Sequence, residues 1–122
     1  MQYETFIDTV ANRAGLPRRD AETLTHAALR VLAERISGGE ARDLAAQLPG
    51  ELKADLEPPQ ENAQSFDANE FARRMAERSG LSAAEAEAAL VAVLTTVRAA
   101  VTPGEFDDVL SQLGEEFAEL VE

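Results

Sequence analysis

The chain contains one histidine, His26, which is the first candidate for acid–base or metal chemistry. Glu22 lies four residues before it, so in a helix the two side chains would share one face and could bind a metal together. When the sequence is shifted by 65 residues and compared with itself, Val91 takes the position of His26. An apolar residue at the equivalent position favours a partly buried packing role for this histidine.

Other arrangements of catalytic and ligand-binding residues do not occur in the sequence. A carboxylate-bridged di-iron centre needs Glu-x-x-His on two helices, and neither copy has this motif. The candidate serines for a Ser-His-Asp triad, Ser37 and Ser82, have the spacing of helix caps. There is no cysteine, no EF-hand loop and no glycine-rich phosphate-binding loop. We therefore expect a protein that is not an enzyme and that uses no cofactor and no metal.

A set of polar residues occurs twice at the same positions of the 65-residue shift. The set consists of Arg13, Glu22, Glu40, Asp43 and Gln47, with Arg78, Glu87, Glu105, Asp108 and Gln112 as the second copies. Because both charges recur, we predict that Arg13 pairs with Asp43. By the same argument Arg78 pairs with Asp108, and each pair ties the first helix of a repeat to its third helix. The predicted role is structural, although an enzyme built on this sequence would have to use the same carboxylates.

The repeat also predicts the architecture that must position these residues. Gly15-Leu16 matches Gly80-Leu81 without a gap, and Gly39-Glu40 matches Gly104-Glu105. We predict a first helical repeat over residues 1–56, a linker over residues 57–65 and a second helical repeat over residues 66–122. The linker, EPPQENAQS, has two prolines and no apolar periodicity. Since each unit is too small to be stable alone, we expect an all-α, pseudo-symmetric helical bundle with one shared core.

Apolar periodicity and capping residues predict three helices and a short helical tail in each repeat. The third helices begin after Ser37 and Thr102, which have capping-box spacing to Glu40 and Glu105. The other predicted helices are Tyr3–Ala14 and Arg18–Ile36 in the first repeat, and Ala68–Ser79 and Ala83–Val101 in the second. The segment Ala83–Val101 is apolar on almost its whole circumference, so we expect it at the centre of the molecule. Charged residues interrupt its apolar stretch, which is typical of a core helix and not of a membrane span.

The overall charge limits the classes of partner. The formal net charge is -12, which disfavours binding to nucleic-acid backbones and to anionic membranes. The opening MQYETFIDTV has no basic segment followed by an apolar run, so we expect no signal peptide and a cytoplasmic location.

Three segments of the chain resemble a bacterial family catalogued as domain of unknown function 2267. They are YETFIDTVANRAGL, ERISGGEARDLAAQLPGEL and FARRMAERSGLSAAEAE, of which the run GGEARDLAAQLP is the most specific. The resemblance covers nearly the whole chain and implies an all-α fold of two related halves. It implies no activity and no catalytic residues. The second copy departs from the pattern at Pro103, Phe106 and Gly114.

These observations predict a non-catalytic helical interaction or scaffolding module, acting in a stress or regulatory setting. Its partner would be another protein or a second copy of the chain. The alternative is a small-ligand-binding protein with an apolar cavity between the two repeats, and an enzyme that uses carboxylates alone ranks third. A pocket between Ala83–Val101 and Arg18–Ile36 with a converging polar group would favour the ligand-binding alternative.

Overall fold

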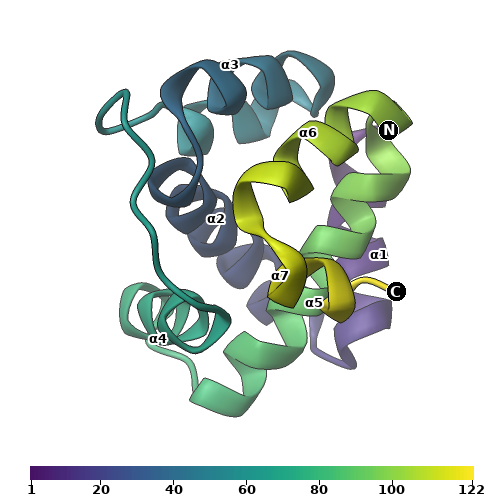
Figure 1. Ribbon diagram of the computed structural model, residues 1–122. Helices are drawn as coiled ribbons and strands as arrows, with labels where there is room; N and C mark the ends of the chain where they lie inside the picture. Colours follow the sequence, from purple (N-terminus) through teal and green to yellow (C-terminus); the bar gives the residue numbers. More distant parts are fainter.

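The computed structural model describes all residues, 1–122, and consists of helices joined by short connections, with no strands (Figure 1). The elements are α1 (Tyr3–Ala14), α2 (Arg18–Arg35), α3 (Gly38–Gln47), the 3₁₀ helix η1 (Gly50–Leu56), α4 (Ala68–Ser79), α5 (Ala83–Ala100), α6 (Pro103–Leu113) and α7 (Glu115–Leu120). The predicted all-α fold is therefore confirmed. The predicted limits of α1, α2, α4 and α5 differ from the observed ones by at most one residue.

Local sequence signals fix the ends of these helices. Gly15 and Gly80 adopt positive φ angles of 67° and 73° and close α1 and α4, as the C-terminal glycine position requires. Ser82 and Glu85 form a complete capping box at the start of α5. The turns that lead into the two long helices are thus determined by a few residues at each boundary.

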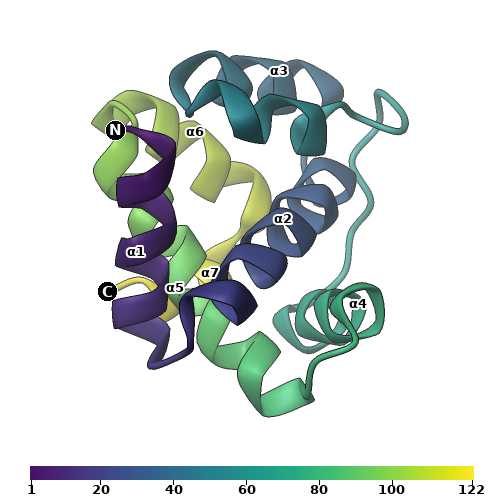
Figure 2. The same cartoon turned by 180° about the vertical axis from the view of Figure 1, so that it is seen from behind.

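The long helices α2 and α5 contact each other, and the two shorter helices α1 and α4 each pack against both of them. Helices α3 and α6 lie side by side at one end of the molecule (Figures 1 and 2). One cluster of buried apolar side chains includes residues from both predicted repeats. Each short helix therefore buries its apolar face against the long helices of both repeats.

Helix α5, which we expect at the centre of the molecule, contacts α1, α2, α4 and α6, but α2 is the more enclosed of the two long helices. Ten residues of α2 are buried and eight of α5. The difference arises because η1 packs on α2, whereas the shorter α7 packs mainly on α6. A strip of α5 that includes Ala88 and Arg98 therefore faces solvent, although α5 has the more apolar sequence.

The segment predicted as a linker crosses the outside of the molecule from η1 to α4 and is held in place (Figure 1). The Gly38 amide donates to the Glu61 carbonyl at 2.9 Å, and the Gln64 amide donates to the Glu34 carbonyl at 2.9 Å. Arg42 also binds the Glu61 carboxylate through two hydrogen bonds. These contacts restrict the chain between the repeats to one path.

A buried arginine joins the C-terminal ends of α2 and α6. The Arg35 guanidinium donates to the carbonyls of Gln112 and Leu113 at 2.9 and 2.8 Å, and to the Phe66 carbonyl at 2.9 Å. A cation suits the carbonyls of Gln112 and Leu113 because they lie at the C-terminal, negative end of α6. Ala100 occupies the equivalent position in the second repeat.

No single helix of the protein is both long enough and apolar enough to cross a membrane; α4 and α5 meet that criterion only as a pair, with an angle of 111° between them.

Candidate functional site

The predicted ion pair between Arg13 and Asp43 does not form. Arg13 lies at the C-terminal end of α1 and donates to the Thr96 hydroxyl of α5 at 3.4 Å. Asp43 takes part in no salt bridge and lies on α3. The prediction was wrong because α1 packs chiefly along α2 and α5 and not on the third helix of its own repeat.

The second predicted pair, Arg78 with Asp108, does not form either. Arg78 lies at the end of α4 and pairs with Glu34 of α2 at 2.5 Å. Arg74, one turn earlier on α4, binds the other oxygen of the same carboxylate at 2.9 Å. The charge of Arg78 therefore ties α4 to the long helix of the other repeat. The correction has the same physical cause, since the first helix of each repeat also packs across the repeat boundary.

Repeated residues of α3 and α6 come together where the two helices begin. Their hydrogen bonds differ from the two separate capping boxes that the sequence predicts. The Ser37 hydroxyl accepts from the Glu40 amide at 3.2 Å, which is half of the predicted box. The other half is replaced, because the Ser37 amide donates to the side chain of Gln112 at 2.7 Å. At the start of α6, the Thr102 amide donates in the same way to the side chain of Gln47 at 2.9 Å. Each glutamine thus caps the opposite helix.

Since the glutamines occupy these amides, the glutamates of the two predicted boxes face one another between α3 and α6. Glu40 and Glu105 are 9% and 8% exposed, and the Oε2 atom of each is buried without a hydrogen-bond partner in the protein. A carboxylate oxygen of Asp43 lies near them, and the three carboxylate oxygens are all within 4.8 Å of one another. We call Glu40, Asp43 and Glu105 the carboxylate cluster.

The carboxylate cluster concentrates negative charge in a poorly solvated place. Burial, together with the adjacent Glu105 carboxyl, raises the pKa of Glu40 to about 8. Asp43 and Asp108 add further repulsion. The arginine nearest in sequence, Arg42, is engaged by Glu61. Groups of this kind can share a proton or bind a divalent cation through oxygen.

A second polar group surrounds His26, between α1, α2 and η1. The Tyr3 hydroxyl donates to Glu22 and lies 2.9 Å from His26 Nε2. His26 Nδ1 contacts the buried Asp55 carboxylate, which also accepts from Arg30 at 2.8 Å. We call these five residues the tyrosine–histidine network. They connect three elements of the first repeat at its surface.

The order Asp55, His26, Tyr3 resembles a catalytic triad with a phenol in the place of the nucleophile. Burial, followed by the hydrogen bond to Glu22, raises the pKa of the Tyr3 phenol above its ordinary value. The Tyr3 hydroxyl donates its proton to Glu22 and not to His26, which would accept the proton of the nucleophile in a triad. This geometry agrees with the packing role expected for His26.

The second repeat has an opening at the positions equivalent to the tyrosine–histidine network. It has a volume of about 260 Å³ and is lined by Ala68, Asn69, Glu87, Leu90, Val91 and Leu120. Three of these residues follow Tyr3, His26 and Asp55 by 65 positions, namely Ala68, Val91 and Leu120. We call this opening the apolar hollow. Smaller and apolar side chains thus leave unfilled the space that polar side chains fill in the first repeat.

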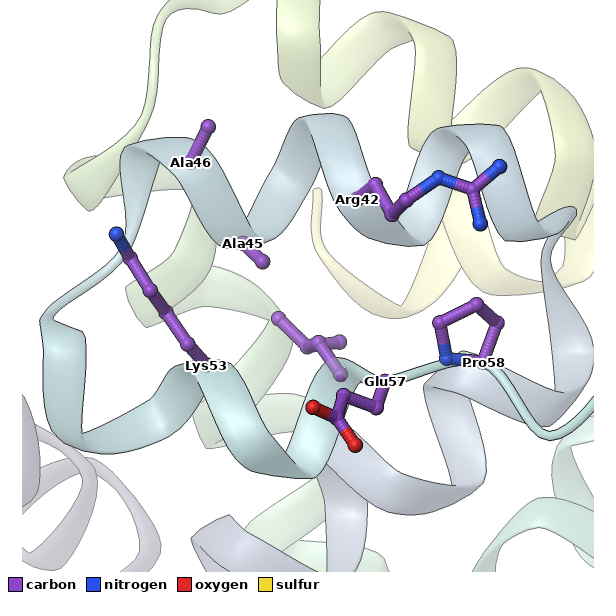
Figure 3. A pocket seen from close by; sticks show the side chains of 7 residues that line it. Arg42, Ala45, Ala46, Lys53, Glu57 and Pro58 are labelled. Carbon is purple, nitrogen blue, oxygen red and sulfur yellow. The ribbon is translucent and has the colours of Figure 1, made fainter.

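The other openings either lack converging polar groups or are lined by charges that already pair with one another. In one of about 450 Å³, Arg30 pairs with Asp55 and Arg78 pairs with Glu34. One of about 330 Å³ lies between α3 and η1, and its charged side chains, Arg42, Lys53 and Glu57, stand at its edges (Figure 3). None of the five openings is lined jointly by α2 and α5, where the sequence placed the alternative ligand cavity. A site with orienting polar groups is typical of a ligand pocket. These openings therefore give no better candidate than the apolar hollow.

The search for recurring residues missed Tyr3 and Asp55. Both are replaced in the second repeat, by Ala68 and Leu120, so neither stands out as a repeated polar residue. A search for polar residues that do not recur would have found them. Tyr3 and Asp55 are polar, and their equivalents in the second repeat, like that of His26, are apolar.

The family model described as an uncharacterized conserved protein (DUF2267) matches residues 3–120. This stretch includes the carboxylate cluster, the tyrosine–histidine network and the apolar hollow. No curated protein matches the chain.

Proposed function

The chain belongs to the family of uncharacterized conserved proteins DUF2267, and from its geometry we propose that it is a non-catalytic helical interaction module. The apolar hollow of the second repeat is its binding site. The partner is a protein segment that places one apolar side chain in the hollow.

The observation that carries this proposal is the difference between the two repeats at equivalent positions. In the first repeat, Tyr3 and His26 occupy the space between the long helix and its neighbours. In the second repeat, Ala68 and Val91 leave a volume of about 260 Å³ there. That volume is near the lower end of ligand pockets, which start at roughly 300 Å³. One large apolar side chain of a partner can therefore fill the place that the protein fills by itself in the first repeat.

The charge of the protein indicates which residues stand beside the apolar anchor in the partner. Glu87 is exposed at the rim of the hollow, and the whole chain has a net charge of -12. A partner segment with lysine or arginine beside its apolar anchor would be attracted by this surface. Anchors of this kind, placed in a pocket, contribute most of the affinity of small interfaces.

The test is selection from a displayed peptide library on the immobilised full chain. We expect enriched peptides to combine an apolar residue with neighbouring basic residues. Val91→Phe fills the hollow and should weaken the selected peptides by at least about tenfold, a loss near 1.4 kcal/mol. Ala99→Phe, which adds the same ring at an exposed position of α5 that lines none of the openings, is the matched control and should leave binding unchanged. Equal binding to Val91→Phe and the unmodified protein would refute the proposed site.

The same hollow supports a second candidate function, the binding of a small apolar ligand with a cationic group. The specific observation is that an apolar wall carries one carboxylate, Glu87, at its rim. Small aliphatic amines would then shift the NMR signals of Leu120, which also lines the hollow, in the unmodified protein but not in Val91→Phe. Such binding without peptide selection would assign the hollow to a small molecule.

The remaining parts of the sequence-based interpretation support a two-repeat module. The equal lengths of α1 and α4, 12 residues each, and of α2 and α5, 18 residues each, support a pseudo-symmetric bundle. A cytoplasmic location, a stress or regulatory setting, self-association and the lack of nucleic-acid binding stay predictions.

A further inference from the structure

We propose that the carboxylate cluster binds one divalent cation of the hard, oxygen-binding class, such as Mg²⁺, Ca²⁺ or Mn²⁺. This inference is independent of the apolar hollow and of the proposed interaction function. It follows from the geometry of the α3–α6 contact, from two carboxylate oxygens without partners, and from the local charge.

The geometry brings repeated residues to one point. Each repeat has a glutamate followed three residues later by an aspartate, Glu40 and Asp43 on α3 and Glu105 and Asp108 on α6. Carboxylate oxygens of the first three lie within 4.8 Å of one another. Oxygens bound to one Ca²⁺ lie about 2.3–2.6 Å from the ion, so two of them can be up to about 5 Å apart. The cluster therefore has the dimensions of a cation site.

Two side chains of the cluster are buried without compensation by the protein. Glu40 and Glu105 are more than nine-tenths buried, and the Oε2 atom of each has no hydrogen-bond partner there. Buried polar atoms are nearly always satisfied, and an unsatisfied carboxylate is among the most costly exceptions. A bound cation between α3 and α6 would satisfy both oxygens at once.

The contact between α3 and α6 is built to hold the glutamates in this position. Gln47 and Gln112 cap the opposite helices, at 2.9 and 2.7 Å, and so fix the register of the two first turns. They also occupy the backbone amides that the glutamate side chains would otherwise bind in a capping box. Both carboxylates are thus directed toward each other, and burial, followed by the neighbouring Glu105 carboxyl, raises the pKa of Glu40.

The donor atoms define the class of cation. All of them are carboxylate oxygens, with no thiolate and no imidazole in the cluster, which suits Mg²⁺, Ca²⁺ or Mn²⁺ better than Zn²⁺ or Cu²⁺. Asp43 is exposed, so the cluster has a solvent-facing side. That side provides an entry path and room for the water ligands that these cations retain.

The experiment is titration of the full chain, freed of metal with a chelator, with MgCl₂, CaCl₂ or MnCl₂ alone. Calorimetry would measure affinity and stoichiometry, and the electron paramagnetic resonance of Mn²⁺ would measure the bound fraction. We work in moderate potassium chloride, because salt screens unspecific attraction to an acidic surface. We expect one tight site, with an apparent affinity that falls at least about tenfold when Glu40→Gln and Glu105→Gln are combined.

Asp107→Asn is the control variant. It removes a charge from α6, the helix of Glu105, at an exposed residue outside the cluster. It should change the affinity less than twofold. Circular dichroism should show that the double glutamine variant is folded, since glutamine keeps the shape of the side chain and removes the repulsion. Two results would overturn the proposal: no stoichiometric binding of any of the three cations, or binding that the double glutamine variant retains. In either case the two glutamates share a proton and not a metal.

Discussion

The tyrosine–histidine network and the apolar hollow occupy equivalent places in the two repeats, yet they solve the same packing problem in opposite ways. In the first repeat, polar side chains from α1, α2 and η1 meet and satisfy one another. In the second repeat, smaller or apolar side chains of α4, α5 and α7 leave an opening. The residues compared are equivalent by the 65-residue shift, whereas η1 packs on α2 and α7 packs mainly on α6. The difference therefore lies in the side chains and in the last element of each predicted repeat.

The two predicted repeats agree in the shared core and differ outside it. The long helices keep their buried apolar positions in both repeats, because their side chains form one core. The outer edge of each repeat contributes little to that core and can exchange a hydrogen-bonded network for an open surface. Arg35 and its equivalent Ala100 show the same divergence at the other end of the long helices.

The largest expected effect comes from giving the first repeat the residue of the second at one position. Asp55→Leu removes the buried acceptor of His26 and Arg30, so we expect the free energy of unfolding to fall by about 2 kcal/mol. Urea unfolding followed by circular dichroism measures the loss. Glu51→Leu, at an exposed position of the same 3₁₀ helix, is the matched control and should change stability by less than about 0.5 kcal/mol.

Combining Asp55→Leu with His26→Val shows whether the network acts as a unit. We expect the double variant to lose less stability than the sum of the single variants, by about 1 kcal/mol or more. If the two losses add exactly, His26 and Asp55 are not coupled. The hydrogen-bonded network would then not stabilise the first repeat as a unit.

A smaller effect of opposite sign is expected in the second repeat. Val91→Phe buries additional apolar surface in the hollow and should raise the free energy of unfolding by up to about 1 kcal/mol. Ala99→Phe, at an exposed position of α5 outside every opening, should give no gain. A loss of stability in Val91→Phe would show that the hollow is too narrow for a large apolar side chain and would count against the proposed binding site.

Most of the fold could be predicted because it depends on local signals. Gly15, Gly80 and the Ser82 cap mark helix ends in the sequence, and the observed helices end there. The apolarity of the two sequences could not predict which of α2 and α5 is more buried, because burial also depends on which other element covers a helix. The closer packing of η1 on α2 is a tertiary feature with no signature in α2 itself.

The residues of the carboxylate cluster could be predicted from the repeat, but their contacts could not. The repeat identified Glu40, Asp43 and Gln47 as a recurring set. Glu40 and Asp43 do meet Glu105 at the α3–α6 contact, and Gln47 caps α6 as Gln112 caps α3. The partners assigned to Arg13 and Arg78 were wrong, because charge recurrence says nothing about which helices pack together. Attraction between unlike charges also suggested cation–carboxylate pairs, whereas the fold brings like charges together.

The smallest effect concerns the charge state of Tyr3, and it separates the network from an ordinary surface contact. Tyr3 is the only tyrosine and there is no tryptophan, so the ultraviolet absorbance of phenolate reports this residue alone. Because burial and the bond to Glu22 raise its pKa, the folded protein retains the phenol proton at pH values where a free tyrosine, with a pKa of about 10, loses it.

The raised pKa of Tyr3 makes the free energy of unfolding depend on pH in the alkaline range. Above a pH of about 10 the unfolded chain binds fewer protons at Tyr3 than the folded protein, so the free energy of unfolding must fall as the pH rises. Glu22→Gln replaces the charged carboxylate acceptor with a neutral amide oxygen, so Tyr3 in this variant should titrate closer to the free residue, and part of that pH dependence should disappear. Spectrophotometric titration of both proteins, folded and in denaturant, provides the measurement. If folded and unfolded chains titrate alike, Tyr3 does not belong to a closed network, and the first repeat is as open at this position as the second.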